Sequence, residues 1–217
     1  RAVLGITARP FPMRFEGPGA EMVRALAPDA GLAVKMAVAN DWLFAPLLVR
    51  KFAATPAAAA TLHTTIAPTM LRGSPKENVL PQDATAWINY RIAPGQTAAQ
   101  VMEHARDATK NLEVELAWEG QAYDPPPVSS QDSDAYRLIA TLASDGGRLP
   151  VAPGLVTATT DSRSLAGIAE NVYRFAPMVA SLHEFEMIHG TNEHMTLANL
   201  GRMTRFYSRL IATAASR

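Results

Sequence analysis

The sequence contains no cysteine, and this absence limits the chemistry open to it. Disulfide bonds, zinc–thiolate centres and a cysteine nucleophile are excluded, so any metal ion has to be held by His, Asp or Glu. An excess of charge is also absent, since 20 Lys and Arg face 20 Asp and Glu and charged residues make up only 18% of the chain. Such a balance lacks the positive surface typical of nucleic-acid-binding proteins. We therefore expect no nucleic-acid partner.

Long hydrophobic runs are missing as well. The longest, residues 43–60, is interrupted by prolines and basic side chains at Pro46, Arg50, Lys51 and Pro56. A membrane span needs roughly 20 apolar residues, so we expect no membrane segment in this chain. The first residues, Arg1-Ala2-Val3, are neither an initiator sequence nor a signal peptide, and we expect a preceding part of the same protein. The compartment, cytoplasmic or secreted and periplasmic, stays open.

The first half of the sequence predicts strands and helices in a recognisable order. Short helices are expected within residues 22–36 and a nearly all-apolar helical segment over 40–49, which should pack against something large. β-branched and alternating residues predict strands over 61–70 and 85–92, with Pro68 tolerated only at an edge or a bulge. Thr97 and Gln100 form a capping box for a helix to about residue 110. Alternation predicts a further strand over residues 112–118.

The order strand, strand, helix, strand matches a split β-α-β-β-α-β unit without its first strand and helix. In that topology the strand over residues 112–118 would pair with the first strand, so it has no neighbour here. Its apolar alternation therefore indicates an incomplete sheet.

Asp124-Pro125-Pro126-Pro127 predicts a stiff connection and a domain boundary, which divides the chain into residues 1–120 and 121–217. Beyond it, short strands alternate with helices, a pattern typical of an α/β fold. The expected elements are a helix capped by Asp132 or Ser133, a strand over 155–158, a helical turn over 162–168 capped by Asp161, a strand over 171–177 and a long helix over 196–214.

Histidines gather in one polar segment. His183, His189 and His194 suggest a local metal site, although the spacing of His189 and His194 misses the i, i+4 spacing of a helical zinc motif. The alternative for each histidine is an ordinary solvated residue without a role in metal binding. We apply that interpretation to His63, on a strand, and to His104, on an exposed helix face.

Several segments, in this order, resemble the zinc-dependent aminoacylase, carboxypeptidase and desuccinylase family of di-metal exopeptidases (peptidase clan MH). The residues that carry the resemblance are Thr64–Thr69 with Gly73–Pro81, Ile88–Gly95, Thr160–Arg163, Val172–Pro177 and His189–Glu193. Asn40–Leu47 further resembles the branch of vacuolar carboxypeptidase S and secreted N-acyl-amino-acid hydrolases. Five motifs in a fixed order are much more specific than any one of them.

The resemblance implies a fold and a set of partners. The fold is α/β: an incomplete ferredoxin-like lid and dimerisation domain over residues 1–120, followed by the carboxy-terminal part of an α/β zinc-peptidase domain over residues 121–217. It also implies a homodimer formed through the lid and a substrate that is an N-acyl amino acid or a small peptide with a free carboxylate.

Site residues follow from the same resemblance. His189 is implied as the last zinc ligand, with Glu193 as a nearby acceptor for the second ring N–H. Asn78 and Arg91 are implied to hold the substrate carboxylate or the developing oxyanion. The loop implied to line the substrate pocket consists of Thr160, Asp161, Ser162 and Arg163.

The complete family site contains two zinc ions, and this chain offers at most one ligand for them. No catalytic residue is expected here, because the motifs that supply the general base and the bridging carboxylate do not occur before residue 61. We therefore expect the carboxy-terminal portion of a di-zinc amide hydrolase that is inactive alone. The alternative is a non-catalytic dimerisation or binding module.

Overall fold

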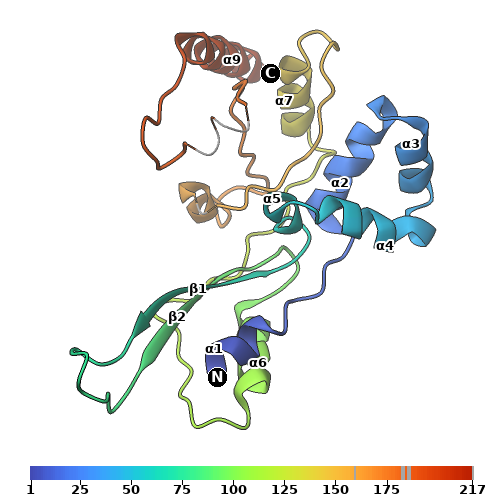
Figure 1. The fold of residues 1–217 in the computed structure, drawn as a ribbon. Coiled ribbons are helices and arrows are strands. Elements are labelled where there is room, and N and C mark those ends of the chain that lie inside the picture. Colours follow the sequence, from blue (N-terminus) through green and yellow to red (C-terminus); the bar gives the residue numbers. More distant parts are fainter. Residues whose placement is uncertain (159, 182–183, 185–186, 217) are drawn as a thin grey trace. The chain divides into compact units, whose positions relative to one another are not determined.

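The computed structural model describes residues 1–217 except 159, 182–183, 185–186 and 217, and these form two compact units (Figure 1). Unit 1 comprises Arg1–Val128 with Pro153–Thr159, and unit 2 comprises Ser129–Ala152 with Thr160–Arg217. The elements of unit 1 are α1 (Ala2–Thr7), α2 (Gly17–Leu26), η1 (Ala27–Asp29), α3 (Leu32–Ala39), α4 (Asp41–Phe52), α5 (Pro56–Ala59), β1 (Thr65–Arg72), β2 (Thr85–Arg91) and α6 (Ala98–Thr109). Those of unit 2 are α7 (Asp134–Ala143), η2 (Asp161–Leu165) and α9 (Leu197–Ala215). The units are defined by contacts and not by role, so the division at residue 120 stays a prediction.

Unit 1 contains an antiparallel hairpin, which confirms two of the predicted strands. Thr65 of β1 lies opposite Arg91 of β2, and the register shifts between Pro68 and Met70. Proline has no N–H to donate to a strand ladder, so an irregularity beside Pro68 is where the chain accepts it.

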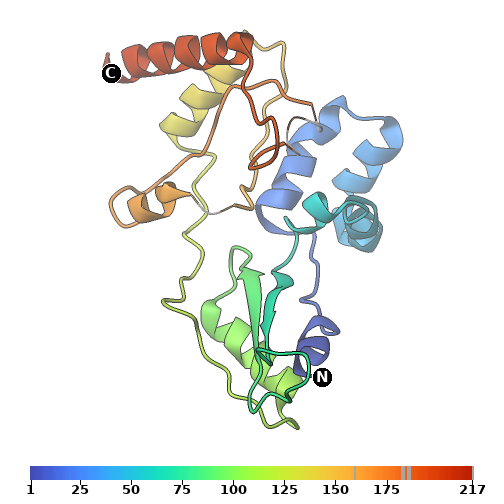
Figure 2. The same cartoon turned by 60° about the vertical axis from the view of Figure 1, so that its left-hand side comes forward.

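Helices α1 and α6 pack against each other beside this hairpin (Figures 1 and 2). Their contact is close, because a Cβ added to Gly5 would lie 3.0 Å from the carbonyl oxygen of Ala108. Ile6 and Val101 are almost fully buried between these elements. The predicted capping box at the start of α6 is present, with the Thr97 and Gln100 side chains each bound to the other residue's main-chain N–H.

The two histidines predicted to be solvated are both half-buried, which corrects that interpretation. His104 stacks on Phe11 with 4.4 Å between ring centroids, and its Nε2 lies 2.6 Å from the carbonyl oxygen of Arg9. His63 precedes β1 rather than lying on it, and its Nδ1 lies 2.9 Å from the carbonyl oxygen of Ala59. The His104 ring is covered by a segment more than 90 residues away in sequence, whereas the contact of His63 is with a residue four positions earlier.

The helices predicted in residues 22–49 are present, with interruptions at η1 and at Gly31. Pro46 lies inside α4. The apolar residues Trp42, Leu43 and Leu47 of this helix remain exposed, with exposed fractions of 79%, 57% and 48%. The described part of the chain therefore does not provide the packing partner expected for this segment.

The strand predicted over residues 112–118 is absent, since these residues pair with no described strand. The sheet of unit 1 consists of β1 and β2 alone among the described residues, so residues 112–118 have no neighbouring strand to which they could form hydrogen bonds. Its apolar residues instead line one side of an open cavity of about 350 Å³ along the end of α6. The lining residues are Arg106, Thr109, Lys110, Leu112, Val114 and Leu116.

Unit 2 is built on the packing of α7 against α9, with Leu138 and Phe206 buried (Figure 2). Both helices begin as expected, because the Ser133 and Thr196 side chains accept main-chain N–H groups at the two starts. η2 occupies part of the predicted turn, but its capping side chain is Thr160 and not Asp161.

Residues 155–158 and 171–177 form no strand, which corrects both of those predictions. In residues 171–179, side chains occupy main-chain groups that a neighbouring strand would otherwise bind. The Ser129 hydroxyl bonds both the N–H and the carbonyl oxygen of Val172, at 2.8 and 3.1 Å. The Asn199 amide does the same for Val179, at 3.0 and 2.9 Å.

The mixed helix and strand composition confirms the broad fold class. The ferredoxin-like arrangement is not established by a sheet of two strands. Among the described helices, none has both the length and the hydropathy needed to cross a lipid bilayer.

The phenol of Tyr90 on β2 yields a test of the hairpin's packing. Its oxygen is buried and has no hydrogen-bond partner among the described residues, and burial raises the pKa of Tyr90 above the usual 10.0. Replacing a buried, unpaired hydroxyl by hydrogen removes a desolvation cost, so Tyr90→Phe should raise the free energy of unfolding by about 1 kcal/mol at pH 7.

The pH dependence provides the second measurement. Because the pKa of Tyr90 is raised in the folded state, the unfolded chain loses this proton at lower pH than the folded chain, so the wild-type unfolding free energy should fall as pH rises above 10.0. Urea denaturation between pH 8 and 11 should show a shallower fall for Tyr90→Phe. Equal slopes for both proteins would contradict the burial of this group.

Candidate functional site

Arg91, one of the predicted carboxylate-binding residues, ends β2 in unit 1. It is exposed, and its Nη1 donates to the carbonyl oxygen of Thr157, in the segment that returns to unit 1 from later in the sequence. Asn78 is exposed in the connection between β1 and β2, and its side chain forms no hydrogen bond with a described residue. Both side chains are therefore accessible, and Arg91 is positioned by a carbonyl distant in sequence.

The predicted pocket loop, Thr160–Arg163, forms the start of η2 in unit 2. The Thr160 hydroxyl accepts the N–H of Ser162 at 3.3 Å, and the hydroxyls of these two residues contact each other. Arg174 joins them, since its Nε donates to Ser162 Oγ at 2.5 Å and approaches Thr160 Oγ1 at 3.4 Å. The loop is thus bound to an arginine for which the sequence analysis predicted no role.

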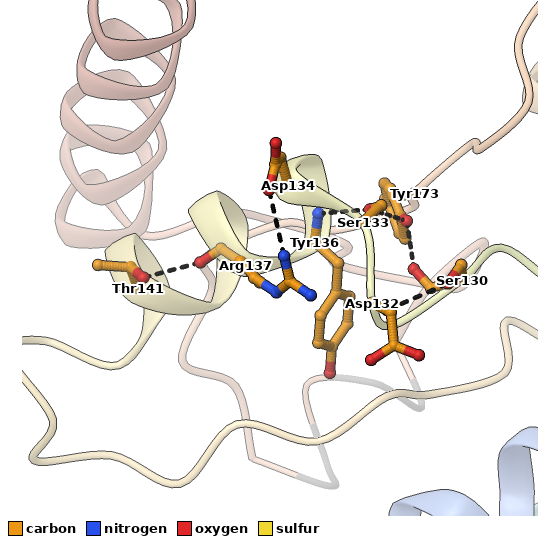
Figure 3. Close-up of polar contacts among 8 residues, drawn as sticks. All are labelled: Ser130, Asp132, Ser133, Asp134, Tyr136, Arg137, Thr141 and Tyr173. Atoms are coloured by element: carbon orange, nitrogen blue, oxygen red, sulfur yellow. Dashed lines mark hydrogen bonds and ion pairs between the residues drawn. The ribbon is translucent and has the colours of Figure 1, made fainter.

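The residue before Arg174 is held by a chain of hydroxyl contacts (Figure 3). The Tyr173 hydroxyl donates to the carbonyl oxygen of Ser130, so its single proton is used there. It then accepts from Ser133, whose oxygen lies 2.5 Å away and itself accepts the N–H of Tyr136 at 3.0 Å. This chain joins the start of α7 to Tyr173 with every donor used once.

The charged pair in the same view has a lesser role. Asp134 and Arg137 are 3.2 Å apart on the exposed side of α7, and such surface pairs contribute about 0 to 1 kcal/mol. The hydroxyl chain, and not this ion pair, fixes the start of the helix.

His189, the predicted zinc ligand, lies in an exposed turn with an unusual backbone. Its φ is +62°, the left-handed region, as is the φ of Asn192. A residue with a Cβ pays roughly 1 to 2 kcal/mol for this conformation, and such conformations cluster at functional sites. The Glu193 carboxylate accepts the main-chain N–H of His189 at 3.1 Å, so it stabilises the turn. Its predicted role as an acceptor for the imidazole stays a prediction.

The described residues do not fit a complete metal site. No three of their His, Asp and Glu side chains are grouped closely enough to hold an ion, whereas a zinc site needs three or four ligands. His194 Nδ1 lies 2.7 Å from the carbonyl oxygen of Asn192. His183, the third member of the alternative local site, lies outside the described residues.

The structure therefore groups the predicted residues into separate parts. Arg91 and Asn78 belong to unit 1, whereas the pocket loop, His189 and Glu193 belong to unit 2. Within unit 2, described hydrogen bonds join Thr160 and Ser162 to Arg174, and His189 to Glu193.

Arg174 is the residue that sequence reasoning missed. The only signal was its place as a single charged residue in the apolar motif Val172–Pro177. Its partners lie 12 and 14 residues earlier in the chain, a relation that no local pattern predicts.

Comparison with known proteins identifies the family. A family model described as a peptidase dimerisation domain matches residues 22–116. N-fatty-acyl-amino acid synthase/hydrolase PM20D1 of Xenopus tropicalis is 34% identical over 90% of this chain and 38% of its own length. The Homo sapiens protein of the same name is 32% identical over 98% of this chain and 43% of its own length.

A third relative is the probable carboxypeptidase S-like 2 of Dictyostelium discoideum, 31% identical over 84% of this chain and 36% of its own length. No solved structure matches the chain. The chain belongs to the M20 family of metallopeptidases and aminoacylases. It spans about two fifths of the length of these relatives.

The hydroxyl chain of Figure 3 gives a test of unit 2. Tyr173→Phe leaves the Ser133 hydroxyl without its acceptor and the Ser130 carbonyl without its donor, so it should lower the free energy of unfolding by about 1 to 3 kcal/mol. Ser133→Ala should cost about 0.5 to 2 kcal/mol through the lost helix cap.

A double-mutant cycle by urea denaturation separates this chain from independent packing. The two changes should couple by about 0.5 kcal/mol or more, because they remove the same hydrogen bond. Arg137→Ala is the control, with an expected change below about 0.5 kcal/mol. Strict additivity of Tyr173→Phe and Ser133→Ala would refute the arrangement.

Proposed function

We propose that this chain is the carboxy-terminal part of a di-zinc metallohydrolase. The reaction is cleavage of the amide bond of an N-acyl amino acid or of a small peptide with a free carboxylate. The observation that carries the proposal is similarity over 84 to 98% of the chain to relatives named N-fatty-acyl-amino acid synthase/hydrolase and probable carboxypeptidase.

His189 provides one zinc ligand in this proposal, and the other ligands come from polypeptide outside the described residues. A ligand on a turn with a left-handed backbone is consistent with this role, because such strain persists where a side chain has to be aimed. Glu193 supports the histidine, by the described main-chain hydrogen bond and, as proposed, by accepting the ring N–H. This chain alone is then inactive.

Substrate binding falls to the remaining predicted residues. The planar guanidinium of Arg91 matches a carboxylate or an oxyanion, and the Asn78 amide can donate to the same charge. The loop formed by Thr160, Asp161, Ser162 and Arg163 lines the substrate pocket, in which Thr160 and Ser162 offer hydroxyl groups. Both residues of unit 1 are exposed, as this role requires.

The lid assignment is part of the same proposal. Residues 1–120 form an incomplete ferredoxin-like lid, in which residues 112–118 would pair with a strand from another part of the same protein. Two chains associate through this lid into a homodimer, for which the match to a peptidase dimerisation domain is the support.

The second candidate function, a non-catalytic dimerisation or binding module, is favoured by the same match over residues 22–116. The two candidates differ in zinc content and in hydrolysis by the complete protein. The module predicts neither, whereas the hydrolase predicts both.

Substitution of His189 tests the hydrolase. In the full-length protein that contains this chain, His189→Ala should lower kcat/KM for N-acyl amino acids by about 100-fold or more, since loss even of groups behind a metal ligand costs 10- to 100-fold. Zinc content, measured by mass spectrometry of the metal, should fall in the same variant.

His194→Ala is the matched control, because His194 lies five residues away and is not a ligand in this proposal. Its activity and zinc content should stay near those of the wild type. A large loss in His194→Ala, or stoichiometric zinc in the isolated 217-residue chain, would favour the local site of His183, His189 and His194 instead.

A further inference from the structure

Arg174 has a main chain that is fixed on both sides. Tyr173, before it, is bound to Ser130 and Ser133 at the start of α7. Phe175, after it, accepts a hydrogen bond on its carbonyl oxygen from Tyr207 Oη of α9, at 2.5 Å. The Phe175 ring also packs on Phe206, with 5.1 Å between centroids. The position of the Arg174 Cα is therefore set by two helices of unit 2.

The side chain of Arg174 is oriented as well. Its Nε donates to Ser162 Oγ and approaches Thr160 Oγ1, and the two hydroxyls contact each other. Binding through Nε fixes the plane of the guanidinium group, because the three nitrogens are coplanar. The side-chain entropy that a ligand would otherwise have to overcome is already lost in the free protein.

The two terminal amino groups of this guanidinium remain available. Neither forms a hydrogen bond or an ion pair with a described residue, and the described ion pairs involve other arginines, at 24, 137 and 148. Arg174 is exposed. An arginine held through Nε and free at both terminal nitrogens offers a pair of parallel N–H donors, which is the geometry that a carboxylate accepts.

The charge of Arg174 itself favours the same ligand. Its guanidinium group stays positively charged at any physiological pH, so an anion is preferred over a neutral group at this position.

We infer that Arg174 binds the free carboxylate of the substrate and thereby selects acids over amides and esters. This inference rests on the proposed function for the class of substrate. It also gives the residues separate roles, because Arg91 and Asn78 would then stabilise the developing oxyanion and not the carboxylate.

Binding without turnover gives the direct test. In the full-length protein stripped of metal by a chelator, calorimetry would compare N-acetyl-L-phenylalanine with N-acetyl-L-phenylalanine amide. Arg174→Ala should weaken binding of the acid by about 10- to 100-fold and leave binding of the amide unchanged. Arg174→Lys keeps the positive charge but lacks the two parallel N–H donors of the guanidinium group, so its affinity for the acid should lie between those of Arg174→Ala and the wild type.

Arg202→Ala is the matched control, because Arg202 is an exposed arginine of α9 outside the loop. It should bind both compounds like the wild type. With the metal restored, Arg174→Ala should raise KM for the acid far more than it lowers kcat. A purely structural role would instead weaken both compounds alike and lower the melting temperature.

The possible results distinguish failure of the proposed hydrolase function from failure of the role given to Arg174. If the wild type neither binds nor hydrolyses the acid, the proposed function fails. If the wild type prefers the acid and both Arg174 variants keep that preference, the function stands and the role of Arg174 is refuted.

Discussion

The hydroxyl of Tyr173 is the contact on which the arrangement of unit 2 depends. It accepts a hydrogen bond from Ser133 and donates one to the carbonyl oxygen of Ser130, so the start of α7 and the segment after residue 171 are held by one hydroxyl group. Because Ser133 is also the helix cap, the beginning of α7 and the position of this segment are coupled. The candidate carboxylate-binding arginine follows directly in sequence.

Side chains replace a strand ladder throughout this segment. Ser129 and Asn199 each bind both main-chain groups of one residue, Val172 and Val179 respectively. A neighbouring strand would bind main-chain groups all along the segment. Here, among the described residues, only the main chains of Val172 and Val179 are bound in this way, so the main-chain groups of the residues between them are not held by a strand ladder. The irregular main chain is therefore fixed at these two residues, where side chains bind both of its polar groups.

Local patterns predicted the features that local physics decides. The capping box at Thr97, the cap at Ser133 and the proline at a strand irregularity all depend on residues within a few positions of one another, and all are present. Alternation in residues 112–118 predicted a half-buried strand, but Val114 and Trp118 are exposed. Such a pattern contains no information on whether a neighbouring strand exists.

Contacts between distant segments limited the prediction of the site in the same way. The environment of His104 depends on Phe11, which is 93 residues away, so its helix position alone suggested a solvated ring. The hydrogen bond of Arg91 to Thr157 spans 66 residues. The resemblance to a family implied a ligand role for His189, whereas its left-handed backbone was visible only in three dimensions.

The chain passes between the two units three times, because residues 153–159 return to unit 1 before the sequence ends in unit 2. Neither unit is therefore one continuous stretch of sequence. A single recombination event between relatives, at any point from residue 92 to residue 156, would inherit Arg91 and its carbonyl partner from different parents. Exchange of whole units in evolution requires three crossovers, one at each passage between the units, which favours inheritance of this region as a block.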